Sequence, residues 1–224
     1  MEEREFDYQW NNLKCADLEY TQERIRELLS LTKLKRSFFM SKTCLDAGCG
    51  NGRYTLAMLQ LGASVESIDI SPEAIEACKQ VNPKARVFDV MNLQPDPRFD
   101  FVFCWGVLHH LKDPRAAFTK VASQVKPHGI LHIMVYHKKT QKTYEYGRQI
   151  WRTLTVEEKL NLCREMVRKY GGHVHGWWDA YNPQYNWSYI PGEIKRWFEE
   201  EGFKRVKLTK KYNINMRGEK SEHM

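Results

Sequence analysis

The chain lacks long apolar runs, paired-cysteine motifs and internal repeats. No uninterrupted apolar stretch in its 224 residues reaches the roughly 18 residues that a membrane-spanning helix needs. Residues 1–5 are charged and lack the apolar core of a signal peptide, so a cytoplasmic location is expected. A hydrophobic content of 42% is nevertheless enough for a folded core, and this excludes a disordered chain.

Cysteine is present but shows no metal-binding or cross-linking pattern. The six cysteines are scattered and include no C-x-x-C pair, which argues against a zinc site and against a disulfide framework. No metal site is therefore expected. Cys44 and Cys104 fall in apolar runs typical of strands, whereas Cys49 lies within a glycine-rich segment.

Charge is unevenly distributed along the chain. The net charge is +7, and the whole excess lies in residues 138–224, because acidic and basic residues cancel over 1–137. A cationic last third could attract phosphate, carboxylate or nucleic acid, or it could be an ordinary solvated surface.

Between residues 42 and 137, strands and helices are predicted to alternate at short spacing. Ser71-Pro72 and Asp113-Pro114 are typical of helix starts, and Gly62 is typical of a helix end. Such alternation predicts βαβ units and a doubly wound parallel sheet. The predicted strands cover residues 42–47, 64–70, 85–90, 100–107 and 130–136, with closing strands at 204–209 and 212–216.

Four segments are expected on this basis. Residues 1–41 form an arm, with aromatic residues at Phe6–Trp10, and a helix over 17–36; residues 42–137 form the core. Residues 138–192 form a helical and aromatic insertion after the fifth strand, with Ile150 expected to face inward. Residues 193–224 supply a last helix, the closing strands and a frayed polar tail from Arg217.

A glycine-rich turn between the first strand and the next helix predicts a nucleoside cofactor site. The spacing is Asp46-x-Gly48-x-Gly50-x-Gly52, with Cys49 inside the turn, and it differs from the dinucleotide pattern GxGxxG. An acid before the first glycine favours an ammonium and a sulfonium over a pyrophosphate.

Further acids follow at the ends of the next two strands. Asp69, followed by Ile70, ends the second strand and could accept hydrogen bonds from both ribose hydroxyls. Asp89 ends the third predicted strand and could accept from an adenine amino group, while the backbone of Val90 contacts the ring edge.

These motifs together resemble the class I, Rossmann-like methyltransferases that use S-adenosylmethionine, over residues 42–137. The resemblance implies a seven-stranded sheet and places the segment containing Trp105 at the methionine end of the cofactor. The Asp/Asn-Pro-Pro-aromatic motif of many base-amine methyltransferases is missing here. Asn182-Pro183-Gln184-Tyr185 is similar but lies beyond the fifth strand.

Candidate catalytic residues lie after the fourth strand and in the insertion. His109 or His110 could act as a general base, although this His-rich stretch could equally be a structural turn. Tyr181 belongs to a dense aromatic cluster in the position of a substrate lid. That cluster could surround a small acceptor, stack on bases or form a satellite core; it comprises Trp177, Trp178, Tyr181, Tyr185, Trp187 and Tyr189.

The favoured function is methyl transfer from S-adenosylmethionine to O, N or C of a small-molecule acceptor. An RNA or protein methyltransferase is the first alternative, because the last third is basic. A nicotinamide oxidoreductase and a cofactor-binding protein without catalysis are further alternatives. The acceptor and the oligomeric state are left open.

Overall fold

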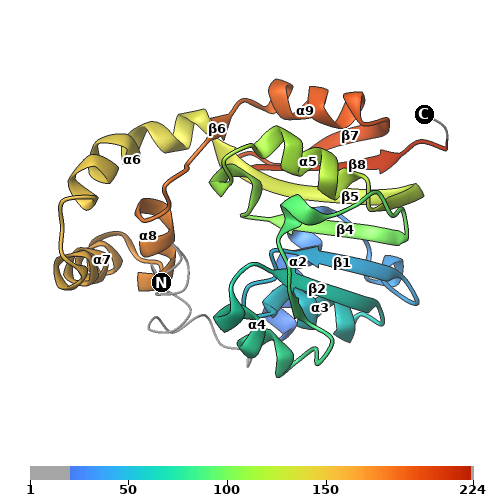
Figure 1. Ribbon diagram of the computed structural model, residues 1–224, viewed down its shortest axis with the longest axis horizontal. Helices are drawn as coiled ribbons and strands as arrows, with labels where there is room; N and C mark the ends of the chain where they lie inside the picture. Colours follow the sequence, from blue (N-terminus) through green and yellow to red (C-terminus); the bar gives the residue numbers. More distant parts are fainter. Residues whose placement is uncertain (1–20, 223–224) are drawn as a thin grey trace.

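The computed structural model describes residues 21–222 of the chain (Figure 1). The expected arm at Phe6–Trp10 and the first part of the helix predicted for 17–36 lie outside these described residues. The remainder of that helix is α2, Thr21–Thr32, which buries Ile25 and Leu28 as the spacing predicts. It ends before residue 36 because Lys33 adopts a left-handed backbone with φ 55.

Seven strands form one continuous sheet in the order β3-β2-β1-β4-β5-β8-β7. The first five pair in parallel, and β8 runs antiparallel to both of its neighbours. The predicted doubly wound, seven-stranded α/β sheet is therefore confirmed, with a short additional strand, β6, paired to the end of β5. The bounds are β1 Thr43–Ala47, β2 Ser64–Asp69, β3 Arg86–Val87, β4 Phe99–Trp105, β5 Val125–His137, β6 Ser188–Tyr189, β7 Phe203–Lys210 and β8 Ile214–Lys220.

The helices begin where the sequence carries capping residues. The Ser71 hydroxyl accepts from the Ala74 amide at 3.3 Å, and Asp113 Oδ1 accepts from the Ala116 amide at 3.0 Å. A proline follows each cap at the first helical position. The remaining helices are α3 Arg53–Gln60, α4 Pro72–Lys79, α5 Pro114–Ala122, α6 Lys138–Trp151, α7 Val156–Tyr170, α8 Val174–Tyr181 and α9 Pro191–Glu200.

The core lies on both faces of the sheet. Phe101 and Phe103 of β4 pack on one face with α2 and α3, whereas Val102 and Cys104 pack on the other with α5 and α9. All four side chains are fully buried. This is why β4 is an almost continuous apolar run in the sequence.

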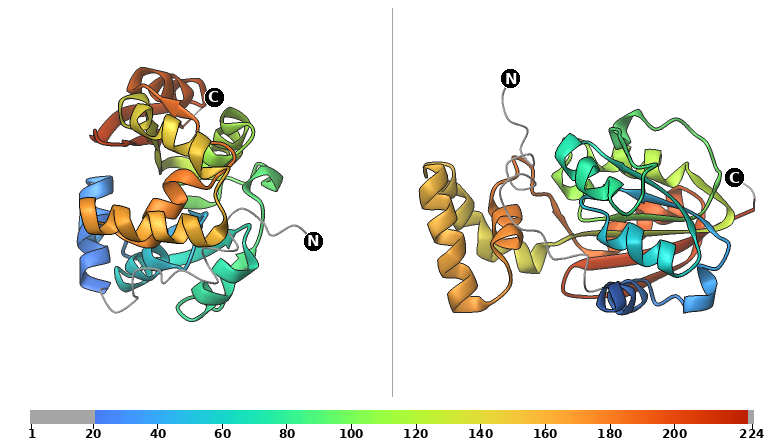
Figure 2. Two further views of the ribbon diagram at one scale, coloured as in Figure 1. Left: turned by 90° about the vertical axis from the view of Figure 1, so that its left-hand side faces the viewer. Right: turned by 90° about the horizontal axis from the view of Figure 1, so that it is seen from below.

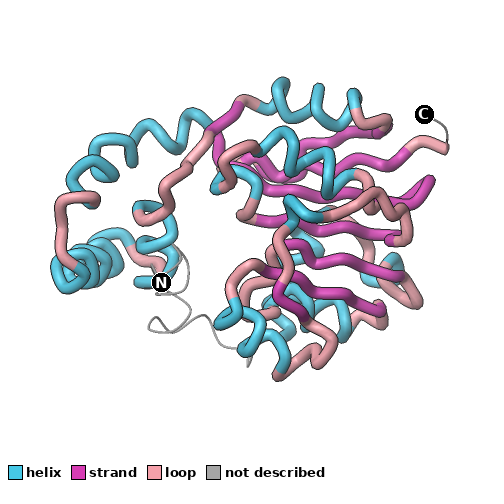
Figure 3. Tube along the Cα trace, viewed as in Figure 1, coloured by secondary structure: helices cyan, strands magenta, loops and turns pink. Residues whose placement is uncertain are grey.

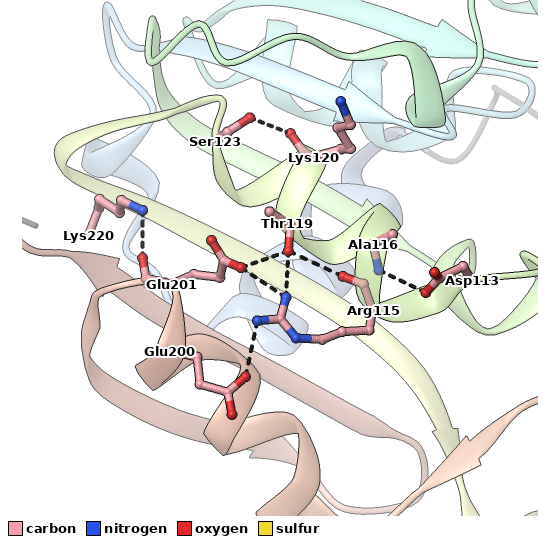
Figure 4. A network of polar contacts seen from close by, with 9 residues as sticks. All are labelled: Asp113, Arg115, Ala116, Thr119, Lys120, Ser123, Glu200, Glu201 and Lys220. Carbon is pink, nitrogen blue, oxygen red and sulfur yellow. Dashed lines mark hydrogen bonds and ion pairs between the residues drawn. The ribbon is translucent and has the colours of Figure 1, made fainter.

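Figure 4 shows a polar network that joins α5 to α9 over this second face. Arg115 donates to Glu201 Oε1 at 2.9 Å and to Glu200 Oε2 at 3.0 Å. Lys220 of β8 donates to the Glu201 carbonyl at 2.6 Å. Exposed ion pairs contribute only about 0–1 kcal/mol each, so the network orients α9 more than it stabilises the core.

Residues 138–192, called the lid insertion below, contain α6, α7 and α8, which lie together to one side of the sheet (Figures 1 and 2). They have a separate hydrophobic cluster formed by Trp151, Cys163, Trp178 and Tyr181. A capping box between Thr155 and Glu158 starts α7. Figure 3 shows that helices and loops make up most of this part of the chain.

Three sequence-based expectations are wrong in detail. The third strand covers only Arg86–Val87, because the chain turns into a 3₁₀ helix at Val90–Asn92. The predicted frayed tail is ordered as far as Lys220, because β8 pairs with both β5 and β7. Ile150 is 43% exposed, since Trp151 takes the inward position on α6.

No helix in the described part of the chain has the length and apolar character needed to cross a membrane.

Candidate active site

A cavity of about 450 Å³ lies at the carboxyl ends of β1, β2 and β4. The order of the sheet places β1 beside β4, where the chain reverses its direction of winding, and ligands of open α/β sheets bind at this point. Residues of α6 and α8 line the opposite side of the same cavity. Core and lid insertion therefore share one candidate site.

The glycine loop forms part of the inner wall of the cavity. The amides of Gly48 and Cys49 donate to the carbonyl of Ile68 at 2.8 and 3.0 Å, which ties the loop to the end of β2. Gly48 has φ 81, and a Cβ at this position would lie 2.1 Å from Val107 Cγ2. The hydrogen bond with Cys78, together with burial, raises the pKa of the Cys49 thiol, so this thiol stays neutral.

Asp69 is the best-positioned acid of the site. Its Oδ2 accepts from the Gly50 amide at 2.9 Å, and its Oδ1 accepts from the Ser71 amide at 3.0 Å. The carboxylate lines the cavity, and its contact with a ribose stays a prediction. Asp69 thus braces the glycine loop and presents acceptors to a ligand.

Asp89 also lines the cavity, but it does not end a strand. It caps the 3₁₀ helix, and its Oδ1 accepts from the Met91 amide at 2.8 Å. Ile70, Phe88 and Val90 line the cavity beside it. The position expected for an adenine ring is therefore formed by a turn, and contact with adenine stays a prediction.

Asp46 is placed differently from the prediction. Its side chain is 2% exposed and lies beneath the loop, where Thr55 Oγ1 donates to Oδ2 at 2.7 Å. Neither Asp46 nor Gly52 lines the cavity, because the strand alternation turns Asp46 toward α3 and Gly52 packs against Cys78. The structure therefore places Asp46 behind the glycine loop, and its contact with a methionine ammonium stays a prediction.

Burial raises the pKa of Asp46 to about 7, with the Thr55 hydrogen bond opposing the rise. The folded state thus binds the carboxyl proton of Asp46 more tightly than the unfolded chain does. The stabilisation that this proton gives to the folded state is complete below about pH 4 and is lost as pH rises through 7. In Asp46→Asn, the amide oxygen of the side chain can still accept the hydrogen bond from Thr55, but the negative charge of the carboxylate is absent. We expect the variant to exceed the wild type in free energy of unfolding by about 1–3 kcal/mol near pH 8, and by much less near pH 5.

Urea denaturation across this pH range measures the difference between Asp46→Asn and the wild type. Glu145→Gln, an exposed substitution on α6, is the control and is expected to show no such trend. A difference for Asp46→Asn that does not change with pH would contradict the assignment.

His109 and His110 both line the cavity, in a 3₁₀ helix directly after β4. The His109 ring centroid lies 3.8 Å from that of Tyr136. Burial lowers the pKa of His109, and the neighbouring His110 lowers it further. His110 Nδ1 lies 2.9 Å from the Tyr185 carbonyl and must donate to it, and burial lowers the pKa of His110. Both imidazoles are therefore neutral near pH 7, and their catalytic role stays a prediction.

Tyr181 is not in the cavity. Its ring stacks on Trp151 at a centroid distance of 5.5 Å, and it packs closely over Gly147. This aromatic side chain is part of the core of the lid insertion, and the catalytic role expected for Tyr181 stays a prediction.

Several other residues that line the cavity belong to no sequence motif and were not predicted. Tyr136 is the penultimate residue of β5, so the rule that ligands bind at strand ends could have found it. Several others lie on helices or loops of the last half, namely Gln141, Tyr144, Asp179 and Asn213, and Arg53 lies at the start of α3. Trp105 lines the cavity as expected, and Arg53 lies over its ring at 5.2 Å.

Together, the fold and the cavity define a Rossmann-like protein with a nucleoside-type site at the switch point of its sheet. The chain belongs to the methyltransferase-domain family, whose model matches residues 18–208. The resemblance noted from the motifs is thereby confirmed, and the match argues against a nicotinamide oxidoreductase.

Individual relatives agree with this family. The chain is 34% identical over 125 residues to the mitochondrial ubiquinone biosynthesis O-methyltransferase of Schizosaccharomyces pombe, covering 48% of this chain and 46% of that protein. It is 27% identical over 175 residues to the ubiquinone biosynthesis O-methyltransferase of Coxiella burnetii, covering 75% and 66%. The chain thus matches about half to two thirds of the length of these relatives.

Solved structures share the fold. Magnesium protoporphyrin IX methyltransferase from Synechocystis PCC 6803, with bound S-adenosylmethionine, superimposes with a TM-score of 0.60 at 15% identity. The superposition covers 96% of this chain and 93% of that one.

Proposed function

We propose that the protein transfers a methyl group from S-adenosylmethionine to a hydroxyl of a small-molecule acceptor. The observation that carries this proposal is the continuity of the cavity, which joins the glycine loop and Asp69 to residues of α6 and α8. Donor and acceptor can therefore lie in one enclosed space, as in-line displacement requires.

The residues present fit the cofactor. The carboxylate of Asp69 lies at the cavity wall at the end of β2, where an acid suits ribose hydroxyls. Phe88, Asp89 and Val90 offer a wall for adenine. Gly106, with φ 81, has only Met134 Cε within 4 Å of the position of a Cβ, so the backbone there leaves room for a ligand. When bound, the cofactor supplies a methyl group on a sulfonium that a nucleophile can displace.

Three observations support methyl transfer to an oxygen atom of a small acceptor. A volume of about 450 Å³ is within the usual range for small-ligand sites. Arg53 is the only lysine or arginine that lines the cavity among the described residues, and the basic strand β7 contributes none of its residues. The two relatives named above are O-methyltransferases, which supports oxygen as the methylated atom.

Proton removal is assigned to the histidine pair. A neutral imidazole can accept a proton from a hydroxyl that lies within hydrogen-bond distance. His109 and His110 are neutral and lie at the cavity wall, shortly after Trp105–Val107 in the chain. They are the candidate proton acceptors in this proposal.

The test uses the full chain with methyl-labelled S-adenosylmethionine and a metabolite extract. Label in a low-molecular-weight product, together with calorimetric binding of S-adenosylhomocysteine, is the expected result. Label in RNA or protein with a steep salt dependence would favour the first alternative. Binding of NADH without binding of S-adenosylhomocysteine would overturn the proposal.

Arg53→Met is expected to weaken binding of S-adenosylhomocysteine by about 10- to 100-fold, the value of a lost charged hydrogen bond. Arg53 lies at the first turn of α3 and makes no ion pair with a described residue, while Tyr54 and Trp105 hold its guanidinium at 4.8 and 5.2 Å. A helix N-terminus and a cation together favour the single carboxylate of the cofactor. Isothermal titration calorimetry measures the change.

Binding of 5′-methylthioadenosine, which lacks that carboxylate, serves as the control for Arg53→Met. The variant should bind it as the wild type does. An equal loss for both ligands would show that Arg53 supports the loop and does not bind the carboxylate.

A further inference from the structure

Three polar side chains lie on one face of α6. This helix lines the side of the cavity opposite the glycine loop, which is called the acceptor part of the cavity below. Gln141, Tyr144 and Arg148 follow at helical spacing, and Gln141 and Tyr144 line the cavity. Gln141 is 5% exposed and Arg148 is 8% exposed, so both polar groups are buried. Arg148 lies one layer behind the cavity wall.

The guanidinium of Arg148 has no carboxylate partner in the described part of the chain. Its Nε donates to the Ala180 carbonyl at 2.9 Å, and its Nη2 donates to Gln141 Oε1. The rings of Tyr136 and Tyr144 lie 6.0 and 5.8 Å from its central carbon. Burial lowers the pKa of Arg148, yet an arginine remains charged at neutral pH. The charge of Glu145 acts on Arg148, but no carboxylate of the described residues forms an ion pair with this buried cation.

This contact fixes the orientation of the Gln141 amide. A guanidinium has only donors, so it must face Oε1, and the amide nitrogen Nε2 must face away from it. Nε2 makes no hydrogen bond to a described residue, and Gln141 lines the cavity. The protein thus presents an N–H donor to the acceptor part of the cavity, with a positive charge directly behind it.

The other walls do not offer a comparable place for an anion. Burial lowers the pKa values of His109, His110 and His175, which are therefore neutral. Asp179 of α8 lines the cavity, and its charge contributes to the raised pKa of Tyr136, so this side repels anions. Arg53 also lines the cavity, but it is assigned above to the carboxylate of the cofactor. A negative group on the acceptor is therefore favoured on the α6 side.

We propose that the acceptor carries an anionic oxygen group, a carboxylate or phosphate, that binds the Gln141 amide in front of Arg148. The inference rests on the proposed function, and it names the class of acceptor for the same site. Gln141 is then the specificity-determining residue, and Arg148 is the positioning residue that holds the amide in its donating orientation.

The first test is the chemistry of the acceptor itself. The labelled product that the wild-type chain forms in a metabolite extract is isolated and identified by mass spectrometry. An acceptor with a carboxylate or a phosphate is expected, and its mass distinguishes the two. A neutral or purely cationic acceptor overturns this inference while leaving methyl transfer established. Absence of both product and S-adenosylhomocysteine binding overturns the proposed function beneath it.

The second test uses Gln141→Glu with the acceptor so identified. The new carboxylate can pair with Arg148, so the fold is retained, but the N–H donor is replaced by a negative oxygen. KM for the acceptor should rise at least about tenfold, with the affinity for S-adenosylhomocysteine within about twofold of the wild type. Gln149→Glu makes the same change on the exposed face of α6 and should have no effect.

Retention of the wild-type KM in Gln141→Glu overturns the inference. Gln141→Leu provides a second variant that has no donor and no new charge. It should raise KM in the same direction, and an unchanged KM for this variant would likewise exclude a contact between Gln141 and the acceptor.

Discussion

Gly48→Ala is expected to reduce the affinity for S-adenosylhomocysteine by about 100-fold or more. The backbone of Gly48 has φ 81, which a residue with a Cβ adopts only with strain, and the new Cβ would lie 2.1 Å from Val107 Cγ2. Left-handed strain and overpacking together should lower the free energy of unfolding by about 2–5 kcal/mol. Calorimetric titration and chemical denaturation measure the two effects.

The clash and the strain at Gly48 can be separated. Gly48→Ala combined with Val107→Ala removes the crowding methyl groups and should recover part of the loss. Gly171→Ala has a similar φ of 77 but open space around the Cβ, so it reports strain without a clash. Gly192→Ala has neither and should resemble the wild type. Wild-type binding by Gly48→Ala would mean that the loop does not approach the ligand.

Trp151→Ala is expected to reduce methyl transfer by about 100-fold or more while leaving S-adenosylhomocysteine affinity within about fivefold. Trp151 is 1% exposed, stacks on Tyr181 and donates from Nε1 to Asn182 Oδ1 at 3.2 Å. Loss of a buried tryptophan lowers the free energy of unfolding by about 3–5 kcal/mol. The packing that is lost here belongs to the separate cluster of the lid insertion. Transfer assays, calorimetry and hydrogen exchange of α6–α8 measure the outcome.

Tyr146→Ala is the matched control for Trp151→Ala. Tyr146 is an aromatic residue of the same helix that is 73% exposed, so its removal should change neither transfer nor exchange. Equal losses of cofactor affinity and of transfer in Trp151→Ala would show that the lid insertion and the core form one cooperative unit.

Local signals in the sequence were sufficient for the core. The caps at Ser71 and Asp113, the glycine loop and the strand end at Asp69 all lie where short-range patterns place them. Each pattern depends on backbone chemistry within a few residues, and the parallel sheet follows from their alternation. The fold class, and a cavity beside the glycine loop and Asp69, were therefore predictable.

The direction of a side chain was less predictable than its position in the chain. Asp46 is at the end of β1, but the alternation of the strand turns it toward Thr55 and away from the cavity. Tyr181 lies in the aromatic cluster, but helix α8 turns it toward Trp151. A strand end or an aromatic segment can be located in the sequence, but which of its residues face the cavity depends on packing that the pattern does not specify.

The acceptor side depends on contacts between distant residues. Arg148 and Gln141 are ordinary polar residues of an amphipathic helix in the sequence. Their significance arises only when α8 brings the Ala180 carbonyl against α6 and buries the guanidinium. No local pattern encodes this arrangement.

The lid insertion has its own hydrophobic cluster, which shares no buried residue with the two large clusters of the sheet. Substitutions inside α6–α8 therefore act on a packing unit other than the one that supports the glycine loop. We therefore expect variation on the α6–α8 side of the cavity to have little effect on the stability of the glycine loop. A lineage can alter the molecule that it methylates and still inherit an intact machinery for holding the methyl donor.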